Sequence, residues 1–150
     1  MKNIILTLCL LSIMLIPALA FAQKAAPGDA ILGVWFNAEK DAKIEITKVD
    51  GKFFGKVIWL KNPNDAKGKP KTDIENPDPK LRTRPRLGLV VLTNLEYDKG
   101  INYDGGKIYD PKSGKTYSCQ AKLANNNLLK LRGFIGISLI GRTSEWTKAE

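Results

Sequence analysis

The stretch IEITKVDGKFFGKVIWL, Ile44–Leu60, decides the fold class of this chain. Its first half alternates apolar and polar residues, as a strand with one buried face does. The Asp50-Gly51 pair that follows is the strongest short signal for a tight β-hairpin turn. In the second half, alternation places Lys56 on one face and Val57 with Trp59 on the other. The stretch therefore predicts an antiparallel hairpin whose Trp59 points inward.

Short apolar runs separated by turn residues continue on both sides of this hairpin, and no amphipathic helical repeat interrupts them. A single antiparallel up-and-down β-barrel of about eight strands would remove the unpaired edges that a small open sheet exposes. We therefore predict an all-β barrel, with a β-sandwich as the alternative. The further predicted strands are Gly33–Asn37, Leu87–Leu95, Lys107–Asp110, Thr116–Ala124, Leu128–Phe134, Ile137–Ile140 and Thr143–Lys148.

The N-terminus has the layout of a secretory signal peptide. Lys2 forms a short basic region, Ile4–Ala20 is apolar, and Ala20-Phe21-Ala22 is an A-x-A cleavage site. We predict cleavage near Ala22, which makes residues 1–22 the signal peptide and residues 23–150 a single domain. The mature protein would then be periplasmic or secreted and would keep no transmembrane segment.

The composition limits the chemistry that this chain can perform. It contains no His, which removes the usual general base and the usual zinc ligand. Of its two cysteines, Cys9 lies in the signal peptide, so Cys119 remains alone and is predicted to be a buried thiol. No nucleophile–base pair is visible, and Asp73 and Asp78 are linked only by their proximity in one loop. We expect no catalysis, no cofactor and no metal site.

The chain is basic. It has 24 Lys and Arg residues against 15 Asp and Glu residues, a formal charge of +9, and loss of Lys2 with the signal peptide leaves +8. Such a charge favours anionic partners: anionic lipid, an acidic polymer of the envelope, or an acidic small molecule. Export and the lack of a base-stacking motif argue against nucleic acid. Simple solubility explains the same charge equally well.

The segment Lys61–Arg86 is polar, contains five prolines and does not alternate. A loop of this length in a small domain is usually functional or disordered, and we predict a flap across one end of the barrel. Arg82 and Arg84 at its exit could hold an anionic headgroup, because guanidinium groups bind carboxylate and phosphate in a bidentate way. Alternatively, they pair with Asp73 or another acidic residue of the loop and shape it.

Alternation predicts which side chains point into the barrel. Among these, Phe53, Trp59 and Tyr117 are the predicted ligand contacts. If Arg132 faces inward, it is either a counter-charge for the ligand or one half of a buried pair, whereas parity with Lys130 makes it an outward residue. The whole predicted inward set is Ile44, Ile46, Phe53, Val57, Trp59, Val90, Leu92, Tyr117, Cys119, Leu123, Leu129 and Leu131.

Gly33-Val34-Trp35 on the first strand, together with Arg142 near the C-terminus, resembles the pattern of lipocalins and calycins. In those barrels the tryptophan packs beneath the floor and an arginine from a late strand covers its ring, an arrangement that cation–π attraction favours. The resemblance implies that Gly33, Trp35 and Arg142 close one end of the barrel.

A second resemblance is carried by five longer runs: Asp73-x-x-Asn76-Pro77-Asp78-Pro79-x-Leu81-Arg82-x-Arg84-Pro85, Gly88-Leu89, Gly106-x-Ile108-Tyr109-Asp110-Pro111-x-x-Gly114-Lys115-x-Tyr117-x-Cys119, Arg132-Gly133-Phe134-Ile135-Gly136 and Gly141-Arg142-Thr143-x-x-Trp146. Together they resemble an exported bacterial family known as domain of unknown function 2147, which implies an envelope location and a calycin-like barrel without an established activity. We therefore expect an exported, non-enzymatic, lipocalin-like protein that binds a small apolar or amphipathic ligand, with an anionic end as an option. The alternative is an envelope interaction module whose barrel is filled by side chains and whose basic surface docks on anionic lipid or polymer.

Overall fold

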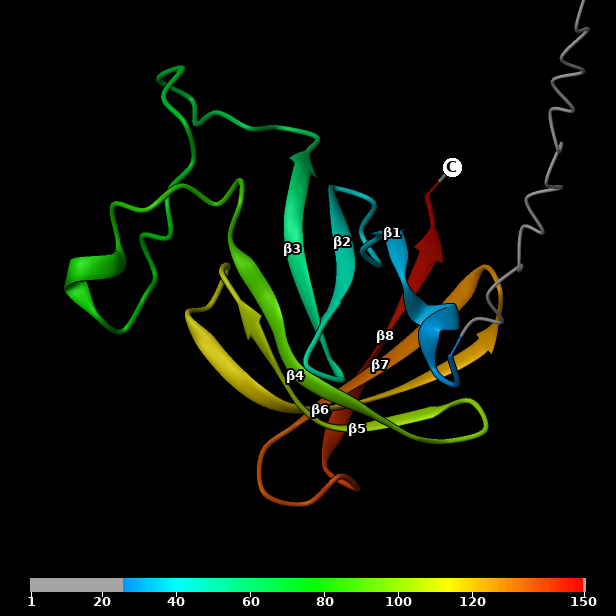
Figure 1. The fold of residues 1–150 in the computed structure, drawn as a ribbon. Helices are drawn as coiled ribbons and strands as arrows, with labels where there is room; N and C mark the ends of the chain where they lie inside the picture. Colours follow the sequence, from blue (N-terminus) through cyan, green and yellow to red (C-terminus); the bar gives the residue numbers. More distant parts are fainter. Residues whose placement is uncertain (1–25, 150) are drawn as a thin grey trace, which may run out of the picture.

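A computed structural model describes residues 26–149 of the chain, so the predicted signal peptide lies outside the described residues. Eight antiparallel strands follow one another around a barrel, and pairing of the first strand with the last closes it (Figure 1). The predicted eight-stranded barrel is confirmed, and the β-sandwich alternative is wrong. The strands are β1 (Gly33–Phe36), β2 (Ala42–Val49), β3 (Lys52–Leu60), β4 (Val90–Lys99), β5 (Asn102–Asp110), β6 (Lys115–Asn125), β7 (Leu128–Phe134) and β8 (Gly141–Lys148).

The hairpin between β2 and β3 forms as predicted. Asp50 and Gly51 have φ values of 49° and 80°, and two successive positive φ angles define the turn that matches the twist of a hairpin. Asp104-Gly105-Gly106 also has the residue types of a turn, but these residues lie inside β5. There the register with β6 shifts between Tyr103 and Gly106, so a β-bulge absorbs the extra residue.

One end of the barrel is closed by the short 3₁₀ helix η1 (Asp29–Ile31) and by side chains. Trp35 is fully buried there and donates a hydrogen bond from Nε1 to the Ile31 carbonyl at 2.8 Å. The Tyr103 hydroxyl donates to the Gly28 carbonyl at 2.8 Å and ties the N-terminal segment to β5. The half of the barrel next to this closed end, here called the lower half, is therefore filled by a packed core. Its fully buried members include Ile46, Phe53, Leu92, Leu95 and Leu129.

A β-bulge reverses the predicted direction of Trp59. Lys43 pairs with Trp59 but Ile44 pairs with Val57, so β3 carries one extra residue at this point. Trp59 consequently lies on the outer face, 39% exposed, with its ring edge-on to Phe36 at a centroid distance of 6.1 Å. The predicted inward placement of Trp59 is wrong, because alternation along a strand holds only where the register is continuous.

Val90 is a second exception to the predicted inward set. It is 44% exposed, and the register between β3 and β4 shifts on both sides of Gly55. Its neighbours Val91 and Leu92 are buried instead. The wall of the barrel on this side is therefore built from Val91, which the alternation did not select.

Residues 61–89 between β3 and β4 form the flap, which projects beside the open end of the barrel (Figure 1). Two bridges, Asn64 to Pro70 and Thr72 to Pro85, fold it back on itself. It also contains the short 3₁₀ helix η2 (Pro79–Leu81), which the Asp78 side chain caps. The flap is thus an ordered substructure that flanks the barrel mouth.

Candidate functional site

The open half of the barrel contains a cavity of about 1040 Å³. This volume suits a small organic ligand, since such sites usually occupy several hundred to about a thousand cubic ångströms. The deep wall of the cavity is mainly apolar and comes from β2 to β8. Its residues include Ile44, Val57, Val91, Ile108, Tyr117, Leu131 and Trp146.

Gly133 on β7 leaves free space in this wall. A Cβ at that position would lie 3.5 Å from both Ile108 and Tyr117, which is ordinary van der Waals contact. A larger side chain there would extend into the cavity. The glycine therefore contributes directly to the width of the cavity, and its position can be used to fill it.

Basic side chains reach the rim of the cavity from two directions. The flap contributes Lys71 and Arg86, and β8 contributes Arg142. Arg86 donates from Nε to the Thr72 carbonyl at 2.9 Å, which fixes the side chain and leaves its two terminal nitrogens for other partners. The rim on this side can therefore attract an anionic group.

One acidic residue that lines the cavity, Asp41, is paired with a lysine. Lys112 contacts Asp41 at 2.9 Å and links the β5–β6 turn to the β1–β2 loop. Burial opposes ionisation of Asp41, but hydrogen bonds from Asn37 and Lys112 outweigh it and hold the pKa of the carboxyl below its usual value. The same contact raises the pKa of Lys112, so both groups stay charged as a pair.

The three predicted aromatic contacts lie in three different places. Tyr117 lines the cavity as expected. Phe53 is fully buried in the closed half, where its ring is edge-on to Tyr103 at a centroid distance of 5.6 Å. Trp59 lies outside the barrel. The structure therefore brings only Tyr117 of this group to the site.

The predicted arginines act mainly within their own loops. Arg84 donates two hydrogen bonds to the same oxygen of Asp73, Oδ2, from Nε at 3.0 Å and from Nη2 at 2.8 Å. Arg82 donates from Nε to the Asn76 carbonyl at 2.8 Å. Arg132 points outward and donates to two carbonyls of the β7–β8 loop. None of these three side chains lines the large cavity.

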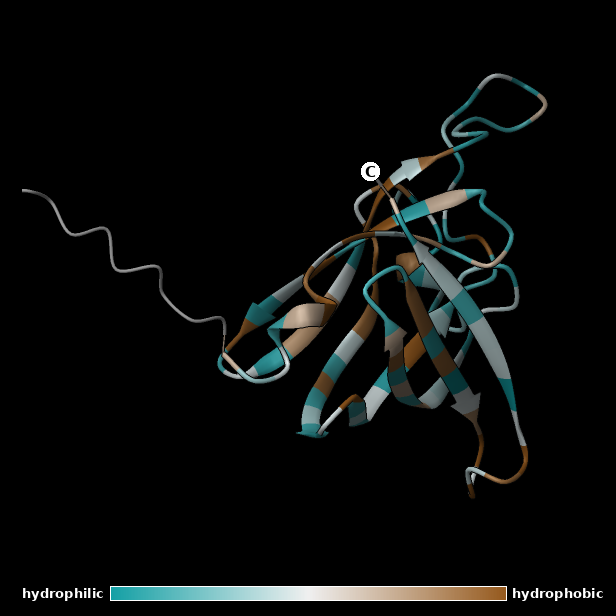
Figure 2. Ribbon diagram, turned by 90° about the vertical axis from the view of Figure 1, so that its right-hand side faces the viewer, coloured by the Kyte–Doolittle hydropathy of each residue, from teal (hydrophilic) through white to brown (hydrophobic). Residues whose placement is uncertain are grey.

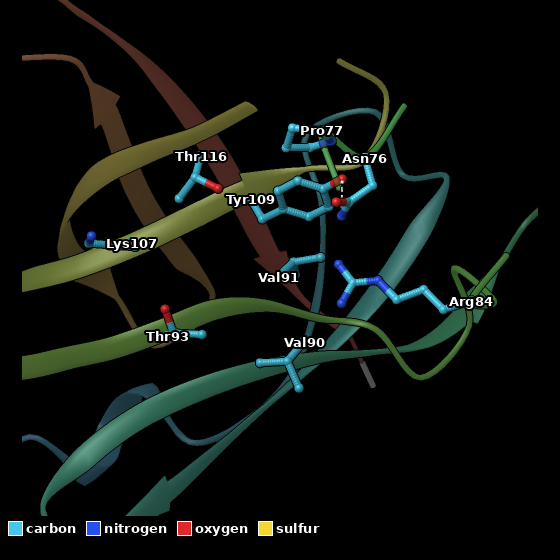
Figure 3. A pocket seen from close by; sticks show the side chains of 9 residues that line it. All are labelled: Asn76, Pro77, Arg84, Val90, Val91, Thr93, Lys107, Tyr109 and Thr116. Carbon is cyan, nitrogen blue, oxygen red and sulfur yellow. Dashed lines mark hydrogen bonds between the residues drawn. The ribbon is translucent and has the colours of Figure 1, made fainter. Parts of the chain in front are cut away.

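A smaller pocket of about 290 Å³ lies between the flap and the outside of β4 and β5 (Figure 3). Asp73 is fully buried beside it and accepts hydrogen bonds from Tyr109 Oη at 2.6 Å and from Asn76 Nδ2 at 2.7 Å. Burial alone would raise the pKa of Asp73, but these bonds and Arg84 keep it below its usual value. These side chains bond to one another within the cluster, so we interpret the cluster as a structural contact that holds the flap to β5. We call the cluster of Asp73, Asn76, Arg84 and Tyr109 the latch.

Lys148, and not Arg142, covers Trp35 at the closed end. Its Nζ lies 4.4 Å from the indole centroid and donates to the Leu32 carbonyl at 2.6 Å. The register explains the difference, because Trp35 pairs with Lys148 while Arg142 pairs with Gly133 at the other end of β8. The predicted Arg142–Trp35 contact is wrong. Gly33, with φ of 115°, leaves the space through which Lys148 passes.

Sequence reasoning missed several residues of the cavity, chiefly Trp146, Lys71 and Arg86. Trp146 is buried and lines the cavity. Alternation on the last strand could have identified it, because the pattern places it on the face opposite Glu145. Lys71 and Arg86 could not be identified in this way, since their positions depend on how the flap folds.

Between residues 26 and 149, no helix has the length and apolar character needed to cross a membrane. The same part of the chain contains no cluster of three or more Cys, Asp or Glu side chains placed to hold a metal ion.

No curated protein matches this sequence. Among solved structures, the barrel is similar to protein HP1028 from the human pathogen Helicobacter pylori, which is described as belonging to the lipocalin family. The two share 29% sequence identity with a TM-score of 0.67, over 79% of this chain and 82% of the other. Residues 33–148 match the family described as uncharacterized protein conserved in bacteria, DUF2147. The chain, an eight-stranded lipocalin-like barrel, is a member of the DUF2147 family.

Proposed function

We propose that this protein is an exported, non-enzymatic binding protein that holds a small amphipathic molecule in the open half of its barrel. The observation that carries the proposal is the cavity of about 1040 Å³ above a fully packed lower half. The similarity to a lipocalin-family structure supports it. The alternative of a barrel filled by side chains fits less well, because residues of β2 to β8 line a cavity of this size.

The cavity lining indicates the polarity of the ligand. An apolar portion would pack against Ile44, Val57 and Leu131, where each square ångström removed from water contributes about 25 cal/mol. An anionic end would lie at the rim near Lys71 and Arg86. The ligand class that combines both features is a single-chain amphiphile with a carboxylate or phosphate headgroup.

Binding can be tested with a fluorescent fatty acid titrated into the chain that begins at Gln23. We expect saturable binding with energy transfer from Trp146, which lines the cavity. In Gly133→Leu the added side chain occupies the cavity, and affinity should fall at least about tenfold, equivalent to ~1.4 kcal/mol. Ser118→Leu introduces a leucine side chain on the exposed face of β6, outside the cavity, and serves as the control.

The headgroup preference needs a separate comparison. Lys71→Gln should weaken the binding of a fatty acid more than the binding of the corresponding neutral alcohol. Equal binding to wild type and Gly133→Leu, or no saturable binding of either amphiphile, would overturn the proposed function. Equal losses for acid and alcohol in Lys71→Gln would overturn the anionic headgroup alone.

Export is the second part of the proposal and has its own test. N-terminal sequencing of the protein recovered from the periplasm or medium should begin at Gln23, directly after Ala22. A recovered protein that still contains Lys2 would contradict cleavage at this site.

A further inference from the structure

The loop of residues 135–140 between β7 and β8, here called the tip loop, is an exposed apolar surface. Four of its six residues are large aliphatic side chains, with exposed fractions between 60% for Ile137 and 84% for Leu139. The strand predicted at Ile137–Ile140 is wrong, because these residues form a loop between β7 and β8. Figure 2 shows this loop as a largely brown, hydrophobic projection beyond the strand ends. Concentrated apolar exposure of this kind usually marks an interaction site.

Hydrogen bonds hold the tip loop in its exposed conformation. Arg132 donates from Nε to the Ser138 carbonyl at 2.6 Å and from Nη2 to the Leu139 carbonyl at 3.1 Å. Its Nη1 donates to Thr143 Oγ1 at 3.1 Å, on the far side of the loop. Within the loop, the Ile140 amide donates to the Ile137 carbonyl at 3.1 Å. The outward direction of Leu139 is thus a consequence of a braced backbone.

The charged residues that flank the tip loop along the chain are positive. From Leu131 to Ser144 the charged residues are Arg132 and Arg142, and there is no acidic residue. The next acid along the chain, Glu145, is paired with Lys130 at 2.9 Å. An aliphatic tip with arginines at its base is complementary to an anionic bilayer. The aliphatic side chains can enter the apolar layer while the arginines contact the headgroups.

The tip loop is also continuous with the mouth of the cavity. Ile135 and Ile140 line the cavity together with Phe134 and Arg142 at the adjoining strand ends. A surface that covers the tip loop would therefore lie against the cavity mouth. A ligand could then move between the two without its apolar part crossing bulk water.

We propose that the tip loop inserts its aliphatic side chains into the surface of an anionic bilayer, with Arg142 contacting headgroups and Arg132 acting as a brace. A protein partner is the less suitable occupant, because protein interfaces are typically centred on aromatic and arginine anchors seated in pockets, and the tip is convex and aliphatic. This inference does not depend on the cavity holding a ligand.

The test is flotation of the chain from Gln23 with vesicles of phosphatidylethanolamine and phosphatidylglycerol, compared with vesicles of phosphatidylcholine alone. We expect binding to the anionic vesicles and about tenfold or greater loss of the bound fraction for Leu139→Asp. The matched control is Ile101→Asp, which makes the same change at an exposed aliphatic residue in the β4–β5 turn of the closed end. Ile101→Asp should bind like wild type.

A second measurement locates the loop. Leu139→Cys can be labelled with an environment-sensitive fluorophore, because Cys119 is buried and will not compete. The label should shift to shorter wavelength on vesicles and be quenched by lipids brominated on their acyl chains. Absence of quenching, or equal flotation of wild type and Leu139→Asp, would overturn insertion. A dimer in solution that Leu139→Asp converts to a monomer would show that a second copy covers the loop, and would overturn the bilayer proposal.

Discussion

Tyr109 on β5 donates its hydroxyl proton to Asp73 Oδ1 in the flap across 2.6 Å, although the two residues are 36 positions apart in the sequence. The Arg84 guanidinium lies 5.8 Å from the Tyr109 ring centroid and binds the other carboxylate oxygen. One buried carboxylate therefore connects both arms of the flap to the barrel wall. This contact holds the flap against β5.

Tyr109→Phe removes the hydroxyl from the latch and leaves the ring. Loss of a hydrogen bond to a buried charged group costs about 1–3 kcal/mol, so local opening of the flap should become roughly 5- to 150-fold more frequent. Trypsin cleavage within the flap, which contains several lysines and arginines, should accelerate accordingly. Tyr97→Phe is the control, because that hydroxyl makes a longer bond of 3.4 Å to the Gly100 carbonyl at the closed end. Equal cleavage rates in both variants would contradict the latch.

The latch should also weaken in acid. The pKa of Asp73 in the folded protein is below its ordinary value of 3.8, so its contribution to stability is complete above that value and is lost as the pH falls through the lower folded pKa. Hydrogen exchange of flap amides should therefore become faster, relative to that of β7 amides, below about pH 4. In Asp73→Asn this relative change should disappear, because no carboxylate remains in the cluster to be protonated.

Gly114 in the β5–β6 turn lies directly against the flap. A Cβ there would overlap the Glu75 carbonyl oxygen, and φ of 70° is also unfavourable for other residues. Gly105 has the same φ of 70° but nothing near its Cβ position. Gly114→Ala should therefore lose more stability than Gly105→Ala, whose cost of about 1 kcal/mol reports backbone strain alone. Equal losses in urea unfolding would mean that the flap does not constrain this turn.

Lys148→Met tests the closure over Trp35. The substitution keeps the aliphatic stem but removes the ammonium, with its cation–π contact and its hydrogen bond to Leu32. We expect a loss of about 1–2 kcal/mol in the free energy of unfolding. Arg142→Met, at the exposed end of β8, should change stability by less than about 0.5 kcal/mol. A larger loss of stability in Arg142→Met than in Lys148→Met would instead support the contact between Arg142 and Trp35 that the lipocalin resemblance implies.

Cys119 should be chemically inert in the folded protein. It is buried, and burial together with the charge of Asp104 raises the pKa of its thiol to about 12. Because the thiolate is the reactive form, a disulfide reagent at pH 8 should modify the chain from Gln23 only as fast as it unfolds. Urea should release one reactive thiol per chain. Rapid modification without denaturant would show that β6 opens locally.

Local sequence determined the strands, the Asp50-Gly51 turn and the barrel class. These features follow from alternation and turn preferences, which depend on neighbours along the chain. The role of Arg84 as a partner of Asp73 was one of two alternatives, because the residue types are compatible with both. The apolar character of the tip loop was visible in the sequence, but the loop was predicted to be a strand. Apolar residue types alone do not distinguish a buried run from an exposed one.

The tertiary structure decided the direction of Trp59, the pairing of Lys148 with Trp35 and the presence of the cavity. A single β-bulge turned Trp59 outward, and the register between β1 and β8 placed Lys148 instead of Arg142 over the indole. The cavity is lined by residues of β2 to β8 and of the flap, which come together only in the folded barrel. Bulges, register and unfilled volume arise from contacts between residues distant in sequence, so no local pattern contains them.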